Sequence, residues 1–269
     1  YVSTNWCGFG LAVSDSPYGP FKDALGKQLL TTEHCPGSTH SWACIDPAVY
    51  QAEEGNAWLY WGNGKCYVAK LKPNMIEIDG EVKDIPPVGS NFTEAPWVHK
   101  HNGKYYLTFA QNWPEKLGYA VSDSPEGPFE YKGIFSEVAG NSNTTHPAIV
   151  EFKGKTILFT HNGGLHEGTS YSRSVCAQEL KYDKKGNILK CDITTDGVPY
   201  LEEYYDRKSK EEKAIRKMES KMGAYLMVYH KDADHGLHMA ISYDGLEFIA
   251  LNDDKPLIAG DTIAEQKGI

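Results

Sequence analysis

Three polar residues occupy the same place in three successive stretches of the sequence. Asp46 lies in Ile-Asp-Pro-Ala, Glu94 in Thr-Glu-Ala-Pro and His146 in Thr-His-Pro-Ala, at intervals of 48 and 52 residues. Two carboxyl groups in one pocket suit the acid–base hydrolysis of a glycoside, because a protonated one releases the leaving group while an ionised one activates water or positions the acid. Each residue alone is compatible with a turn Asp, a surface Glu or a structural His. Their shared position favours one common site.

The segments that follow these residues predict the strands that position them. An aromatic strand begins about ten residues later, after a Gly or Asn turn, and a second strand comes next. The aromatic strands are expected at 56–63, 103–112 and 154–163, the second strands at 65–71, 117–124 and 172–180, and a closing strand at 127–135. Gly, Asn and Pro separate these segments. The pattern predicts a sheet of about four antiparallel strands per repeat.

A duplicated decapeptide sets the length of the repeat. AVSDSPYGPF at 12–21 returns as AVSDSPEGPF at 120–129, an offset of 108 residues with one further, diverged unit between the copies. A period of roughly 50 residues lies in the range of propeller blades, and short strands favour a propeller over a sandwich. We therefore expect an all-β, five-bladed β-propeller, incomplete or rearranged in this chain. Its innermost strands would bring Asp46, Glu94 and His146 to the central channel.

Three regions define the expected organisation. Residues 1–200 form blades that lack the first one, and 223–269 form a partial blade. Between them, residues 201–222 contain no Gly or Pro and are rich in Glu, Lys and Arg. The apolar residues of this segment would fall in one narrow stripe on a helix. This segment predicts a short charged helix, either a solvated linker or, alternatively, a partner-binding helix.

Composition limits the class of ligand. The net charge of −9 argues against nucleic acid and against an anionic membrane surface as partner, and no apolar run is long enough to span a membrane. Six Trp and seventeen Tyr suit a neutral polar ligand such as a sugar, although most of these rings are expected in the core. The six cysteines show no CxxC pair and are expected to be free, partly buried thiols. Neither a phosphate-binding Gly loop nor a GxSxG nucleophile motif is present.

Several runs carry a resemblance to a known family. CIDPAVY, FTEAPWVHKHNGKYYL, GYAVSDSPEGPFEYKGIF, THPAIVEFKGK and YSRSVCAQELKYDKKGNI resemble glycoside hydrolase family 43, which contains β-xylosidases, α-L-arabinofuranosidases and arabinanases. The resemblance covers roughly residues 1–198. It implies a five-bladed propeller that hydrolyses glycosides with inversion through three carboxyl groups.

The resemblance also implies a role for individual residues. Glu94 resembles the general acid, and Asp46 resembles the carboxylate that orients this acid and modulates its pKa. His146 resembles the central His that lies beside a channel water or calcium ion, and Arg173 resembles the Arg that meets the acid and the sugar hydroxyls, contacts to which the guanidinium fork is suited. The resemblance implies no required cofactor. It implies His146 as the place in the central channel for a structural Ca²⁺ ion.

The family's general base is the main departure from the pattern. It is an Asp of the first blade, expected ahead of Tyr1, and no Asp-Pro motif precedes Asp46. The segment from residue 225 to Ile269 resembles the opening of another propeller of this kind. We therefore expect a window from a tandem protein with a second propeller module, or alternatively a single rearranged propeller that residues 223–269 complete.

Exposed aromatic rings are candidates for sugar binding. Trp42 and Trp113 are candidate stacking platforms, whereas Trp97, also a candidate, is better suited to packing between blades. The expected substrate is an oligosaccharide or polysaccharide with α-L-arabinofuranosyl or β-D-xylosyl linkages, as in plant hemicellulose and arabinan. The alternatives are a non-catalytic propeller that binds carbohydrate or protein, and a related enzyme such as a phosphorylase. Xylose or arabinose specificity and endo or exo action stay open.

Overall fold

The chain falls into two compact units in a computed structural model, which describes residues 1–4, 8–86, 92–165, 167–194, 197–198, 225–231, 233–234, 236–242 and 246–258. The first unit comprises Tyr1–Phe9 and Leu29–Val198, and the second comprises Gly10–Gln28 and Pro199–Ile269. The helix predicted at 201–222 lies outside the described residues. Within the described part of the chain, helix is limited to the short 3-10 turns η1 (Thr32–His34) and η2 (Asn252–Asp254), and no helix there is long and apolar enough to cross a membrane.

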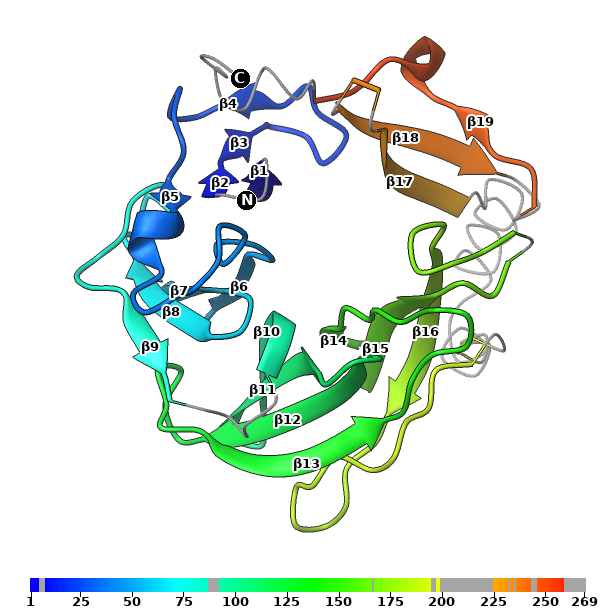
Figure 1. Cartoon of the computed structure of the whole chain (residues 1–269). Coiled ribbons are helices and arrows are strands. Elements are labelled where there is room, and N and C mark those ends of the chain that lie inside the picture. Colours follow the sequence, from blue (N-terminus) through cyan, green and yellow to red (C-terminus); the bar gives the residue numbers. More distant parts are fainter. Residues whose placement is uncertain are drawn as a thin grey trace, which may run out of the picture. The chain divides into compact units, whose positions relative to one another are not determined.

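Antiparallel sheets make up the first unit (Figure 1). The first sheet holds β1 (Val2–Thr4), β2 (Gly8–Gly10) and β5 (Leu30–Thr31). The second holds β6 (Ala48–Gln51), β7 (Ala57–Trp61), β8 (Cys66–Leu71) and β9 (Lys83–Ile85). The third holds β10 (Phe92–His101), β11 (Lys104–Gln111), β12 (Lys116–Ser122) and β13 (Glu130–Ser136). The fourth holds β14 (Ala148–Phe152), β15 (Lys155–Asn162) and β16 (Ser174–Leu180). The prediction of an all-β chain is confirmed.

Two-residue turns set the register of the inner hairpins. Asn102 and Gly103 connect β10 to β11 with φ values of 48° and 80°, and Lys153 and Gly154 connect β14 to β15 with φ values of 51° and 77°. Positive φ at both central positions matches the right-handed twist of the flanking strands, which is why such turns prefer Asn and Gly. The predicted aromatic strands thus pair in order with their neighbours.

Buried side chains join the sheets of this unit face to face. One cluster combines Tyr60 and Val68 of the second sheet with Leu107 and Phe109 of the third. Another combines residues of the third sheet with Ile149 and others of the fourth. The strand β10 lies beside both β6 and β14. The starts of these three strands, where Asp46, Glu94 and His146 are found, are therefore neighbours in space.

The second unit contains a short hairpin and a three-stranded sheet. The hairpin pairs β3 (Ala12–Val13) with β4 (Lys22–Asp23), and the sheet has the order β17 (Tyr225–Lys231), β18 (Gly236–Ser242), β19 (Ile249–Ala250). The first copy of the decapeptide thus belongs to the second unit.

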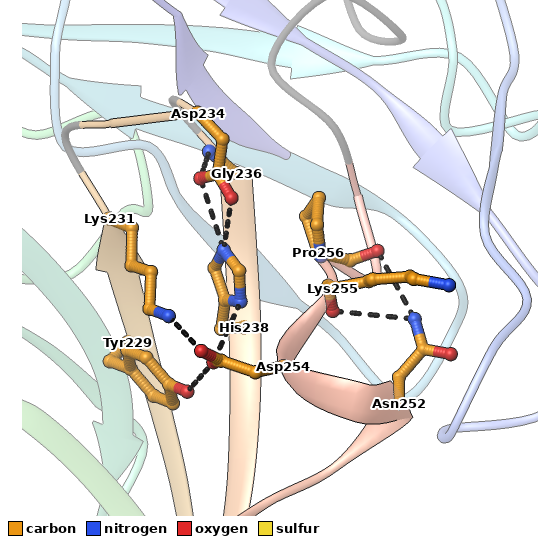
Figure 2. Close-up of polar contacts among 9 residues, drawn as sticks. All are labelled: Tyr229, Lys231, Asp234, Gly236, His238, Asn252, Asp254, Lys255 and Pro256. Atoms are coloured by element: carbon orange, nitrogen blue, oxygen red, sulfur yellow. Dashed lines mark hydrogen bonds and ion pairs between the residues drawn. The ribbon is translucent and has the colours of Figure 1, made fainter.

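A polar network holds one face of the β17–β19 sheet. Figure 2 shows His238 between the carboxylates of Asp234 and Asp254. The ring Nε2 of His238 lies 2.9 Å and 3.0 Å from the two oxygens of Asp234, and Asp254 accepts bonds from the Tyr229 hydroxyl and the Lys231 ammonium group. His238 is 1% exposed, so this network fixes a buried ring between solvated charges.

The two decapeptide copies form the same turn. The Gly19 N–H donates to Ser16 O at 3.0 Å, and the Gly127 N–H donates to Ser124 O at 3.1 Å. Both glycines have positive φ, 80° and 85°, in which other residues are strained. The repeat therefore encodes a local turn rather than a chemical site.

The described cysteines are buried and none of them forms a disulfide: Cys35, Cys44, Cys66, Cys176 and Cys191. This confirms the expectation of unoxidised thiols for these five, and Cys7 lies outside the described residues.

Candidate active site

Asp46 lies just before β6 in a strained backbone conformation. Its φ is 58°, and its own N–H donates to the Ser3 hydroxyl at 3.2 Å. The carboxylate Oδ2 accepts the N–H of Ala95 at 3.1 Å. Burial raises the pKa of Asp46 to about 6, against the opposing effects of the Ala95 bond and the Arg173 charge. Left-handed backbone in a non-Gly residue is stored strain of the kind found at functional sites.

A bulge in β10 places Glu94 next to Asp46. The register with β11 shifts between Phe92 and Glu94 and again between Glu94 and Trp97, and Ala95 has φ 58°. Pro96 fits this irregular stretch because proline has no N–H for a ladder. The bulge turns the Ala95 N–H toward the Asp46 carboxylate. Bulges of this kind re-aim side chains beside functional sites.

Glu94 is held by an amide from the neighbouring sheet. Asn63, in the turn between β7 and β8, donates its Nδ2–H to Glu94 Oε2 at 2.7 Å. Burial raises the pKa of Glu94, and the negative charge of Asp46 raises it further. The Asn63 bond and the charges of His146 and Arg173 act in the opposite direction. The net effect raises the pKa of this partly buried carboxyl, which favours the protonated form that a general acid needs.

His146 and Arg173 complete the cluster that sequence reasoning named. Burial lowers the pKa of His146 to about 4, so its ring is neutral at ordinary pH. Arg173 donates to the Ser170 carbonyl at 2.7 Å and to the Thr144 hydroxyl at 3.3 Å. Its positive charge lowers the pKa values of both Asp46 and Glu94. The four residues therefore act on one another electrostatically.

Two further buried groups lie near this cluster and were missed in the sequence. Glu115 is 1% exposed and accepts the Thr145 N–H at 2.7 Å. Burial, followed by the charge of Glu94, raises its pKa to about 8. His161 is buried with no hydrogen-bond partner at either ring nitrogen among the described residues, and burial lowers its pKa to about 3. Glu115 lies in the turn between β11 and β12, away from the repeated position that singled out Asp46, Glu94 and His146, so that spacing could not point to it.

The three candidate tryptophans differ in their surroundings. Trp42 and Trp113 are 47% and 65% exposed, and Trp42 stacks on His40 with ring centres 4.6 Å apart. Trp97 instead donates its indole N–H to the Ile149 carbonyl at 2.9 Å and packs on the cluster between the third and fourth sheets. Trp42 and Trp113 thus have free ring surface for a ligand, whereas Trp97 bridges two sheets.

The site residues differ from the ligands that a calcium ion prefers. Ca²⁺ takes six to eight oxygen ligands, whereas His146 offers an imidazole nitrogen. No group of three or more His, Cys, Asp or Glu that could hold a metal ion exists in the described part of the chain. The side chains of these residues alone do not supply a full set of oxygen ligands, and a Ca²⁺ ion beside His146 stays a prediction.

Comparison with known proteins identifies the family of the chain. The model of the family "Glycosyl hydrolases family 43" matches residues 1–188. The chain belongs to glycosyl hydrolase family 43. This family 43 chain is 36% identical over 220 residues to a xylosidase/arabinosidase of Bacteroides ovatus, a match that covers 67% of the chain and 64% of the relative. It is also 36% identical to xylosidase/arabinosidase 43A of Humicola insolens, covering 67% of the chain and 65% of that protein.

Solved structures give the same assignment. An α-L-arabinofuranosidase from Clostridium thermocellum superposes with a TM-score of 0.61 at 34% identity, covering 72% of this chain and 68% of the other. A β-xylosidase/α-arabinofuranosidase from a compost metagenome, solved with xylotriose, gives a TM-score of 0.59 at 29% identity, covering 68% and 65%. The chain spans slightly less than two thirds of the length of the two curated relatives named above.

Proposed function

We propose that the protein carrying this chain is an inverting glycoside hydrolase that removes α-L-arabinofuranosyl or β-D-xylosyl units from hemicellulose or arabinan fragments, on a five-bladed propeller. One observation carries the proposal. In a family 43 chain, the carboxyls of Asp46 and Glu94 lie in successive sheets, and the Ala95 N–H next to Glu94 binds Asp46. The relatives named above as xylosidases and arabinosidases support the substrate class.

Glu94 takes the part of the general acid. A raised pKa favours the protonated form of this carboxyl. Its proton passes to the glycosidic oxygen as the bond from that oxygen to the anomeric carbon breaks, while water attacks the opposite face of that carbon and gives a proton to a general base. Asp46 supplies the negative charge that raises the pKa of Glu94, and its own pKa of about 6 leaves it ionised above that pH. Two carboxyls with different environments thus serve as acid and as modulator.

His146, Arg173 and the exposed indoles take substrate-binding parts. The neutral ring of His146 offers one donor and one acceptor, and the Arg173 guanidinium offers several donors to sugar hydroxyls. The exposed faces of Trp42 and Trp113 provide flat apolar surface for a sugar ring. None of these residues takes the part of the general base that activates water.

Hydrolysis of synthetic glycosides tests the proposal directly. The protein is incubated with para-nitrophenyl α-L-arabinofuranoside and β-D-xyloside, and with xylo- and arabino-oligosaccharides, while proton NMR follows the first sugar anomer released. We expect hydrolysis with inverted configuration. A retained anomer would refute the inverting mechanism. Oligosaccharide binding by calorimetry without turnover would instead identify a non-catalytic propeller, and phosphate-dependent products a phosphorylase.

A further inference from the structure

The turn between β7 and β8 is bonded to both carboxyl-bearing segments. The Gly62 N–H donates to the Ile45 carbonyl at 2.9 Å, one residue before Asp46. The Gly64 N–H donates to the Thr93 carbonyl at 2.7 Å, one residue before Glu94. The backbone of this turn therefore holds the two segments at a fixed separation.

The conformation of this turn leaves it little freedom to move. Gly62 has φ 136°, and a Cβ added there would lie 2.0 Å from the Lys65 carbonyl oxygen. The Asn63 N–H donates to the Ala43 carbonyl at 3.2 Å. Asn63 is thus anchored through its backbone, and its side chain reaches Glu94 from a rigid base.

The side chain of Asn63 distinguishes the two oxygens of Glu94. An amide N–H donates to Oε2 at 2.7 Å, so Oε2 is an acceptor and the proton of neutral Glu94 belongs on Oε1. When Oε1–H is transferred to the glycosidic oxygen, the same N–H remains on the carboxylate that is formed. Hydrogen bonds to a charged acceptor are stronger than those to a neutral one. The contact therefore gains strength as the proton leaves.

We propose that Asn63 is a positioning residue for glycosidic bond cleavage, which places the transferable proton on Oε1 of Glu94 and stabilises the carboxylate left behind. The inference rests on the function proposed above. Burial is the largest influence on the pKa of Glu94, and Asp46, Arg173 and, when its ring is protonated, His146 add the effect of their charges. Asn63 differs from these groups because its side chain donates a hydrogen bond to this carboxyl.

The dependence of the rate on the leaving group tests this inference. Asn63→Ala is compared with the parent on an alkyl glycoside, whose leaving group needs a proton, and on a dinitrophenyl glycoside, whose leaving group does not. We expect kcat on the alkyl glycoside to fall about 10- to 150-fold, the value of one hydrogen bond to a charged group. On the dinitrophenyl glycoside we expect a change of about twofold or less, with KM little altered on either.

Two further variants separate positioning from packing. Asn63→Asp keeps the shape but removes the N–H, so it should be at least as impaired as Asn63→Ala on the alkyl glycoside. Asn162→Ala is the matched control. Asn162 has the same place in its repeat as Asn63, at the end of the aromatic strand, but its side-chain oxygen accepts the Gly164 N–H at 2.9 Å. We expect this control to show no dependence on the leaving group, with circular dichroism confirming that each variant is folded.

The outcomes distinguish this inference from the proposed function. Equal losses on both glycosides, or an Asn63→Asp variant as active as the parent, would overturn the role of Asn63. Glu94→Gln is measured on the same pair of glycosides. If it is selectively impaired on the alkyl glycoside while Asn63→Ala is not, only the Asn63 inference fails. If Glu94→Gln shows no selective loss, the general-acid assignment itself fails.

Discussion

The carboxyl groups of the two units have opposite electrostatic character. In the first unit, burial raises the pKa values of Asp46, Glu94 and Glu115. In the second unit, the hydrogen bond with His238 lowers the pKa of Asp234, and the bond with Lys231 lowers that of Asp254. The same carboxyl group thus has a raised pKa in one region and a lowered pKa in the other.

The difference lies in what accompanies each carboxyl. Asp234 and Asp254 are solvated (Figure 2). Asp234 is bonded to the His238 ring and the Gly236 N–H, and Asp254 accepts from the Tyr229 hydroxyl and the Lys231 ammonium group, an arrangement that stabilises a fold. Asp46, Glu94 and Glu115 are largely removed from water and accept bonds only from neutral amides. Strongly perturbed acids of the second kind are typical of functional sites. The comparison therefore assigns chemistry to the first group and structure to the second.

The largest effect is expected at Glu94. Glu94→Gln keeps the size of the side chain and an oxygen that can accept the Asn63 N–H, but it cannot donate a proton to a leaving group. We expect kcat/KM on xylo- or arabino-oligosaccharides to fall about 10²–10⁴-fold, with an unchanged melting temperature. Steady-state kinetics and thermal unfolding measure this. Activity equal to that of the parent would remove the contrast between the two regions.

Replacement of Glu115 by Gln is expected to stabilise the protein, and the gain should depend on pH. The pKa of Glu115 is about 8 in the folded protein and near the ordinary glutamate value of 4.5 in the unfolded chain, so the unfolded chain loses the proton first as pH rises. The folded state therefore loses stability progressively between those two values. Glu115→Gln keeps an oxygen that can accept the Thr145 N–H and removes this loss.

The melting temperature of Glu115→Gln should match the parent at about pH 4 and exceed it by roughly 10 °C at about pH 8. Differential scanning calorimetry at both pH values measures it. Glu53→Gln serves as the control, because Glu53 is exposed in the turn before β7 and should change neither value. A variant that is equally stable or less stable at the higher pH would contradict a buried, protonated Glu115.

The smallest effect on activity is expected at His238. His238→Gln breaks the bonds to Asp234 in the second unit, and we expect the free energy of unfolding to fall by about 1.5–3 kcal/mol, because the lost bonds involve a charged acceptor. The site is assembled from residues of the first unit, so kcat/KM should stay within about twofold. Urea unfolding and kinetics measure the two quantities. Tyr229→Phe loses only the hydroxyl bond to Asp254 and should lower the free energy of unfolding by less. A large loss of activity in either variant would contradict the contrast between the two regions.

Repetition made much of the first unit predictable. The strands expected at 56–63, 103–112 and 154–163 are β7, β11 and β15, because apolar alternation and Asn-Gly turns are local signals. The position shared by Asp46 and Glu94 was readable for the same reason. The helix expected at 201–222 lies outside the described residues, and the blade count stays a prediction.

Asn63 and Glu115 show where sequence reasoning stops. Asn63, Asn112 and Asn162 end the aromatic strand of each repeat, so the repeat singles out all three equally. Only the bulge in β10 brings a carboxyl to one of them, and a bulge depends on the register between two strands. The burial of Glu115 depends on packing between segments about 30 residues apart, which no local pattern records.

The contact between the two catalytic segments has a consequence for mutational tolerance. Asp46 is bound by the main-chain N–H of Ala95, not by its side chain. Any residue that the buried position can hold presents the same N–H, and proline alone lacks it. Only exchanges that suit a buried residue with a φ of 58° are therefore compatible with this link, which depends on a main-chain N–H on one side and on a single carboxylate on the other.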